Sequence, residues 1–185
     1  DAVRKVIEDI KRALEEVRRH TKESIKRNED ILREVEKIAR DIIREIRRIL
    51  ERVREVVERD LKDKDTLRKA VEDVIKRLEE ILKELEDIVR DVIRRLEKTL
   101  KENHDLIREV IKRLEDLVRD LRRKVPEEAV ETLKRVVDDV AKKAKELNRE
   151  DEETVRKIVE ELKRLLDELR REVERVADEA RRAVK

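Results

Sequence analysis

Histidine and cysteine, which are typical of catalytic and metal-binding sites, are scarce or absent in this sequence. There are two histidines, His20 and His104, and there is no cysteine. His20 follows Glu16 by one helical turn, but the Glu-x-x-His pair typical of di-metal helical bundles does not occur. Ser24 lies one turn after His20, yet as a helical neighbour it lacks the oriented base that a nucleophilic serine needs. We therefore expect no enzyme, no bound metal and no catalytic residue.

The composition argues against several further functions. The chain has no glycine, so it contains no glycine-rich phosphate loop and no dinucleotide fingerprint. Its 53 basic and 51 acidic residues are interspersed, which leaves no basic face for nucleic acid or for a membrane surface. No apolar run reaches the length of a membrane span, and without a recognisable signal peptide no compartment is predicted. We expect no cofactor, nucleic acid, membrane or small-molecule ligand.

Several polar residues occupy positions at which the helical pattern of apolar residues predicts buried side chains. Asn28, for example, stands eighteen residues from both Ile10 and Ile46. Buried polar atoms without partners cost about 1–3 kcal/mol each, so we predict a buried hydrogen-bond network that fixes helix register. His104 shares its line with charged residues and is predicted to be solvated. The predicted network consists of Thr21, Ser24, Asn28, Thr99, Asn103, Asn148 and Asp151, with His20 donating into it from the edge.

Long helices are the elements that would position these residues. Apolar residues recur at spacings of three and four, and the lines that they form repeat every eighteen residues, as in Ile7, Ile25 and Ile43. Eighteen residues in five turns is the period of a helix that needs no supercoil, so we expect the helices to be nearly straight. About eight of every eighteen positions are apolar, which suits a helix packed against two neighbours.

Two interruptions divide the chain into three helices. The pattern fails at 62–65, where Asp65 or Thr66 is the expected N-cap. Pro126 ends the second helix and is expected to be the first residue of the third. The predicted helices therefore cover about 2–61, 66–124 and 126–184. Short connections make neighbouring helices antiparallel, which predicts an all-α, up-down-up three-helix bundle forming a single domain over 1–185.

The lengths of these helices also predict which polar residues face one another. Facing residues of the first two helices have numbers that sum to about 127, which places Ser24 opposite Asn103 and Asn28 opposite Thr99. Between the second and third helices the sum is about 250. This sum places Asn103 beside 147–148 and Thr99 beside Asp151.

One segment of the third helix has two interpretations. The local sequence at 148–151 resembles the end of one helix followed by the start of another with an aspartate N-cap. With a turn there, residues 126–185 would form a helical hairpin. The eighteen-residue phase, however, crosses this segment without a break. We therefore predict a continuous third helix and keep the hairpin as the alternative.

The whole chain resembles de novo designed, parametrically generated helical bundles with buried hydrogen-bond networks. The resemblance rests on the absence of glycine, cysteine and aromatic residues, on acidic helix starts such as that at Asp65, and on the predicted polar residues in the core, which are Thr21, Ser24, Asn28, Thr99, Asn103 and Asn148. It implies a soluble, recombinant structural scaffold without natural biochemical activity. The width of the apolar stripes favours a monomer. The alternative is a designed homo-oligomer or conformational switch, in which 126–185 forms the hairpin and the first two helices pair between chains.

Overall fold

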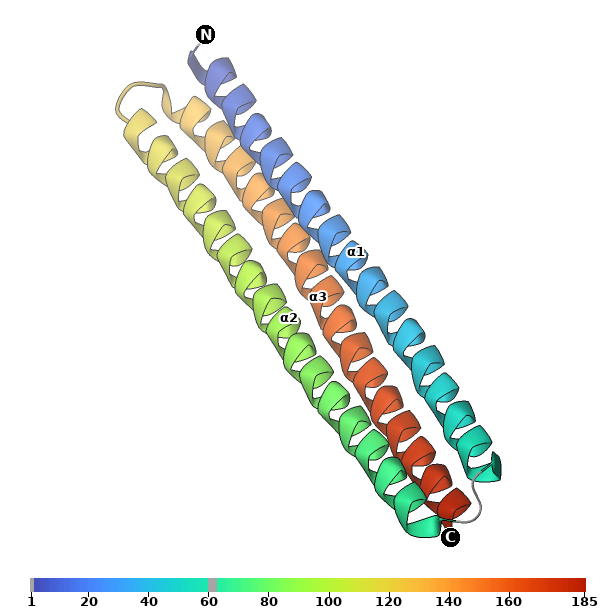
Figure 1. Cartoon of the computed structure of the whole chain (residues 1–185). Coiled ribbons are helices and arrows are strands. Elements are labelled where there is room, and N and C mark those ends of the chain that lie inside the picture. Colours follow the sequence, from blue (N-terminus) through green and yellow to red (C-terminus); the bar gives the residue numbers. More distant parts are fainter. Residues whose placement is uncertain (1, 60–62) are drawn as a thin grey trace. The chain divides into compact units, whose positions relative to one another are not determined.

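The protein is an all-α three-helix bundle, as predicted. The computed structural model describes residues 2–59 and 63–185. They form α1 (Ala2–Arg59), α2 (Lys64–Leu121) and α3 (Glu127–Val184), and the described residues include no strand (Figure 1). Each helix has 58 residues. The predicted end of the first helix near 61 lies outside the described residues.

The helix ends are built without any left-handed residue, since no residue of the described ranges has a positive φ. The N-cap of α2 is Asp63 and not Asp65 or Thr66. Its carboxylate accepts from the Thr66 backbone N–H at 3.4 Å and from the Thr66 hydroxyl at 2.8 Å. Aspartate is a favoured N-cap because its oxygen satisfies a backbone donor in the first turn. The helix therefore begins two residues earlier than predicted.

The connection between α2 and α3 is longer than the sequence suggested. α2 ends at Leu121 rather than near 124, and the Leu121 carbonyl accepts from the N–H groups of Lys124 and Val125 at 2.9 and 3.2 Å. Pro126 stands just before α3, and its carbonyl accepts from the N–H groups at 129 and 130. Proline disfavours a helical conformation at the residue before it, which explains why α2 does not continue to Pro126.

The third helix is continuous, so the helical hairpin over 126–185 is wrong. Residues 148–151 are helical, and the Thr154 hydroxyl donates to the Glu150 carbonyl four residues earlier at 2.8 Å. The side chains of Asn148 and Asp151 are buried. They are directed into the packed side of the helix and do not cap a new one, which is why the local signal for a helix end misleads.

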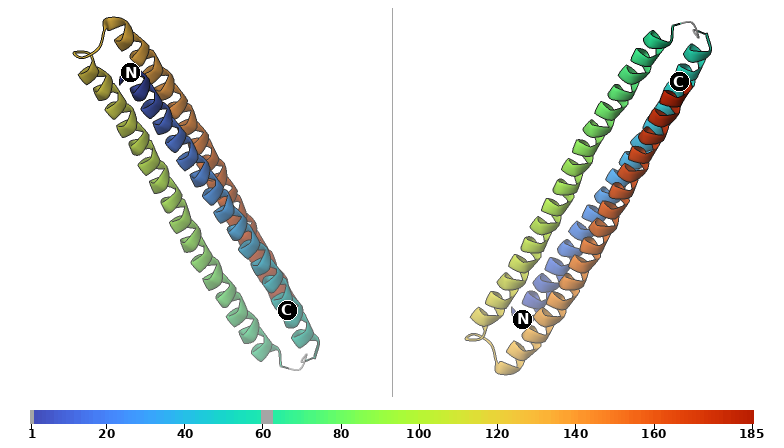
Figure 2. Two further views of the ribbon diagram at one scale, coloured as in Figure 1. Left: turned by 90° about the horizontal axis from the view of Figure 1, so that it is seen from above. Right: turned by 90° about the horizontal axis from the view of Figure 1, so that it is seen from below.

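The described chain consists of two compact units, and each helix contributes one segment to each unit. Unit 1 comprises Asp1–Glu29 and Arg95–Lys157, and unit 2 comprises Asp30–Arg94 and Ile158–Lys185. Within each unit the segment of α2 runs antiparallel to those of α1 and α3 (Figure 2). Whether 1–185 behaves as one domain stays a prediction. The core of unit 1 is formed by Ile10, Leu14, Leu114, Val118, Val130, Leu133, Val137 and Val140, among others.

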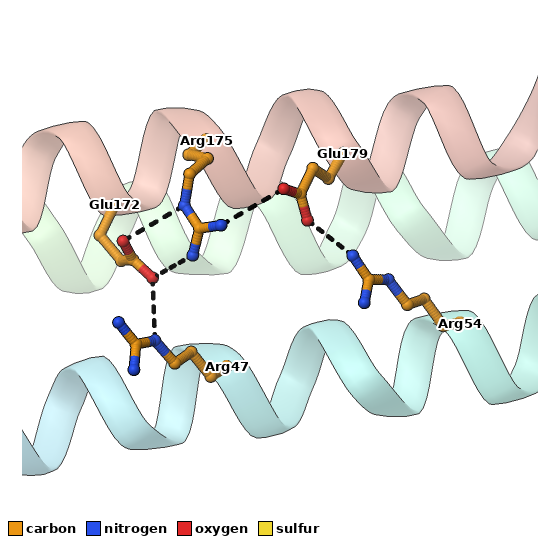
Figure 3. Close-up of polar contacts among 5 residues, drawn as sticks. All are labelled: Arg47, Arg54, Glu172, Arg175 and Glu179. Atoms are coloured by element: carbon orange, nitrogen blue, oxygen red, sulfur yellow. Dashed lines mark hydrogen bonds and ion pairs between the residues drawn. The ribbon is translucent and has the colours of Figure 1, made fainter.

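Unit 2 has an apolar core and a row of ion pairs along α3. Its buried residues include Ile46, Leu50, Val71, Ile75 and Val173. Where α3 meets α1, the Glu172 carboxylate accepts from Arg47 at 3.2 Å and from Arg175 at 2.6 Å (Figure 3). Arg175 holds the pKa of Glu172 below its usual range, chiefly through this hydrogen bond. The ion pairs thus connect residues within α3 and also connect α3 to α1.

Candidate functional site

The polar residues of the core are gathered in unit 1. Among the described residues, six buried side chains are polar or charged, and each is at most 7% exposed. All six belong to the set predicted from the sequence. Because no polar side chain of unit 2 is among them, this cluster is the candidate functional site. The six residues, called the polar layer below, are Thr21, Ser24, Asn28, Asn103, Asn148 and Asp151.

Asn103 on α2 connects the three helices. Its side-chain Nδ2 donates to Ser24 Oγ on α1 at 3.2 Å and to Asp151 Oδ2 on α3 at 3.3 Å. Its Oδ1 is 3.0 Å from His20 Nε2. Because an amide oxygen can only accept, His20 donates this hydrogen bond from Nε2. The Asn103 amide therefore uses both donor hydrogens and its acceptor.

His20 and His104 both contact the polar layer, although only His20 was predicted to do so. Asn148 Nδ2 is 2.9 Å from Nδ1 of the half-buried His104. The prediction that His104 is solvated is therefore wrong. A signal was available, because Ile111 lies seven residues later and two turns along nearly the same face of α2. His104 stands beside the apolar stripe on the side of α2 that meets α3.

Asp151 is the ionisable residue of the polar layer. It is 1% exposed, and Oδ2 accepts from Asn103 while Oδ1 has no partner. Burial raises the pKa of Asp151 above its ordinary value of 3.8, although the Asn103 hydrogen bond and the nearby His20 and His104 act in the opposite direction. Asn148 Oδ1 is also buried without a partner. The layer therefore contains more acceptors than donors when Asp151 is ionised.

Three predicted members do not take part in the hydrogen bonds between helices. Thr21 and Asn28 are buried, but neither forms a side-chain hydrogen bond to another helix among the described residues. Thr99 is exposed, so its predicted place in the buried layer is wrong. It lies eighteen residues from Leu117, which is itself exposed, so this line of α2 is the edge of the apolar stripe and not its centre.

The predicted pairing of Ser24 with Asn103 between α1 and α2 is correct, whereas the register between α2 and α3 is displaced. Ser24 meets Asn103 as expected, but Asn103 meets Asp151 where the sequence placed 147–148. The displacement is about one helical turn.

The layer lacks the geometry of the common catalytic and metal-binding sites. Ser24 Oγ accepts from Asn103, and His20 bonds to Asn103 instead of the serine, so these residues form no nucleophile–base pair. Within the described ranges, no three His, Cys, Asp or Glu side chains are grouped so that they could hold a metal ion. No helix of the described residues has the length and apolarity needed to cross a membrane.

Comparisons with protein-family models, with curated proteins and with solved structures give no match to this chain.

Proposed function

We propose that this chain is a designed structural scaffold without a biochemical activity of its own, in which the polar layer fixes the alignment of the helices. The observation that carries the proposal is the position of Asn103. From α2 it bonds to Ser24 on α1 and to Asp151 on α3, and each bond is buried. The hydrogen bonds of this one side chain thus form only when all three helices of unit 1 are correctly aligned.

The physical basis is the difference between apolar and polar contacts. Leucine, isoleucine and valine side chains lose little when a helix slides by two turns, because a seven-residue shift nearly preserves the apolar face. Hydrogen bonds have no such tolerance, and a buried donor or acceptor that loses its partner costs about 1–3 kcal/mol. A polar layer therefore penalises alternative registers more than it stabilises the correct one.

Regularity of construction supports the interpretation as a design. The three helices have the same number of residues, and one eighteen-residue pattern runs through each of them. Neither helix ends nor turns use a residue with positive φ in the described ranges. Design for a unique structure favours idealised helices and can use buried polar residues to specify the register.

The proposal is tested by replacing the layer with apolar residues. The variant combines Ser24→Ala with Asn103→Leu, Asn148→Leu and Asp151→Leu. We expect its melting temperature to match or exceed that of the parent, because unpaired acceptors are removed along with the hydrogen bonds. We also expect additional oligomers or registers, detected by light scattering after size exclusion and by extra amide cross-peaks in NMR spectra.

Thr99→Leu is the matched control, since it adds an apolar side chain in the same unit without touching the hydrogen bonds. It should leave the distribution of species unchanged. A layer variant that forms one species, with the parent's mass and the parent's contacts between helices, would refute the role in alignment.

A further inference from the structure

The three seams between helices in unit 2 are not equivalent. Ion pairs cross the seam of α1 with α3 and the seam of α2 with α3. Among the described residues of unit 2, no ion pair joins α1 to α2. The crossing pairs are Arg47–Glu172 at 3.2 Å, Arg54–Glu179 at 2.8 Å, Arg170–Glu86 at 2.6 Å and Arg181–Glu72 at 3.1 Å.

The seam of α1 with α2 is an apolar groove. It has a volume of about 340 Å³, and its walls include Ile49, Val53, Val56, Ala70 and Val74. Ile38 on α1 and Ile88 on α2 extend the apolar line beyond the groove. These isoleucines are 52% and 57% exposed, and Val56 is 46% exposed. Exposed apolar side chains that line up in this way mark an interaction surface more often than isolated ones do.

Residues of α1 and α2 at the same level of the groove can be matched by number. The groove is lined on α1 by residues between 49 and 57 and on α2 by residues between 67 and 81. The middles of these ranges are 53 and 74, so matched numbers sum to about 127. By this rule the two bulky exposed residues, Ile38 and Ile88, lie at one level. The smaller pair, Val56 and Ala70, lies at another, about 27 Å away at 1.5 Å per residue.

Charges on the rims of the groove follow the same rule. Arg52 and Arg77, which both line the groove, lie at nearly one level. Glu45 and Glu84 lie two turns away, about 10 Å nearer the exposed isoleucines. Arg52, Arg77 and Glu84 form no ion pair among the described residues, and Glu45 pairs only with the exposed Arg48 of its own helix, at 2.8 Å. The surface is thus positive within the groove, at Arg52 and Arg77, and negative just beyond its end, at Glu45 and Glu84.

We propose that this groove binds a second copy of the chain, packed groove to groove with the two copies antiparallel. A two-fold axis across the groove, between the arginine and glutamate levels, places α1 against α1 and α2 against α2. Arg52 then faces Glu45 of the second copy, and Arg77 faces Glu84. The same operation brings Val56 within about one turn of Ile38, and the small Ala70 within about one turn of the bulky Ile88. The axis that matches the charges and the axis that matches the side-chain sizes lie within about 2 Å of one another.

The parallel arrangement is disfavoured by the same residues. A two-fold axis along the helices would place α1 against α2 of the second copy at equal levels. Arg52 would then face Arg77, Glu45 would face Glu84, and Ile38 would face Ile88. Like charges brought together at an interface oppose association, so the pattern selects one orientation.

This proposal replaces the monomer that the sequence favoured. The apolar stripes of α1 and α2 are wide enough for two neighbours, but the structure shows that one edge of each remains open. The inference rests on unit 2 alone and does not depend on the role of the polar layer.

The test is a set of charge reversals measured by sedimentation equilibrium at several concentrations and salt levels. We expect the parent chain of 22.4 kDa to associate to twice that mass. Arg52→Glu with Arg77→Glu should raise the dimer dissociation constant about 10- to 100-fold, because four rim contacts become repulsive. Adding Glu45→Arg and Glu84→Arg to the same chain should restore the parental constant, since every antiparallel pair is then opposite in sign again.

The matched control is Arg44→Glu with Lys76→Glu, which reverses two exposed charges outside the groove. It should leave association unchanged, and circular dichroism checks that every variant is helical. Ile88→Lys should give a monomer. A monomeric parent at all concentrations, an association to trimers, or failure of the fourfold reversal to restore the dimer would each overturn the proposal.

Discussion

At the scale of single residues, Asp151 determines how stability in unit 1 depends on pH. Its pKa in the folded protein is raised by burial. Between the ordinary value of 3.8 and the raised value, the folded state holds a proton that the unfolded chain has released. The free energy of unfolding therefore falls as the pH rises through this interval and stays at the lower level above it. The ionised carboxylate thus costs stability at neutral pH.

Asp151→Asn removes the charge while keeping an acceptor for Asn103. We expect the free energy of unfolding at neutral pH to rise by about 1–3 kcal/mol, because a buried carboxylate oxygen without a partner is lost. Below the ordinary pKa the two proteins should be nearly equal. Urea unfolding across a pH series measures both quantities. Asp138→Asn, at an exposed site on the same helix, should leave the free energy of unfolding unchanged at both low and neutral pH. Equal behaviour of the two variants would contradict the destabilising role of the ionised Asp151.

The contact between His104 and Asn148 can be isolated by a double-mutant cycle. His104→Leu leaves the buried Asn148 amide without its 2.9 Å partner, and Asn148→Leu removes the amide itself. We expect the double variant to be more stable than the sum of the single effects predicts, by about 1 kcal/mol. The free energy of unfolding of all four proteins gives the coupling. Additive effects would mean that the two side chains contribute independently to the free energy of unfolding.

At the scale of the elements, the periodicity of the sequence predicts the helices well. A single eighteen-residue pattern locates three helices and their continuity through 148–151 because apolar burial, the dominant favourable term, is visible in the pattern. The ends are less predictable. Asp63 and Asp65 are both chemically suitable caps, and the choice between them depends on where the chain turns.

The continuity of α3 is tested by proline at an exposed position of the disputed segment. Glu150→Pro should cost about 3 kcal/mol or more, since proline removes a backbone hydrogen bond and clashes with the preceding turn. In a turn the same change would cost little. Arg123→Pro, in the connection between α2 and α3, is the comparison and should be much better tolerated. Thermal unfolding of the two variants measures the difference, and equal tolerance would argue against a continuous helix.

At the scale of the whole molecule, the sequence predicts membership of the polar layer better than its contacts. Asn28, Asn103 and Asn148 interrupt apolar lines, and such interruptions can be recognised without coordinates. Thr99 interrupts a line too, but that line lies at the edge of the stripe, where one neighbouring helix does not cover it. The partners of His104 and Asp151 depend on the directions of the side chains and on the distance between helices. The periodicity of the sequence gives neither quantity.

The confinement of the polar layer to unit 1 has a consequence for how the chain reaches its native state. During collapse, helical segments can meet two turns out of step and still bury nearly the same apolar surface, which would create kinetic traps. Such a mispaired intermediate would leave Asn103 and Asp151 without their partners, so we expect it to be less stable and to dissociate more readily than an intermediate with a wholly apolar core. The amide side chains and the one carboxylate of the polar layer therefore favour the native alignment of the helices during folding. Contacts between apolar side chains alone would not select it.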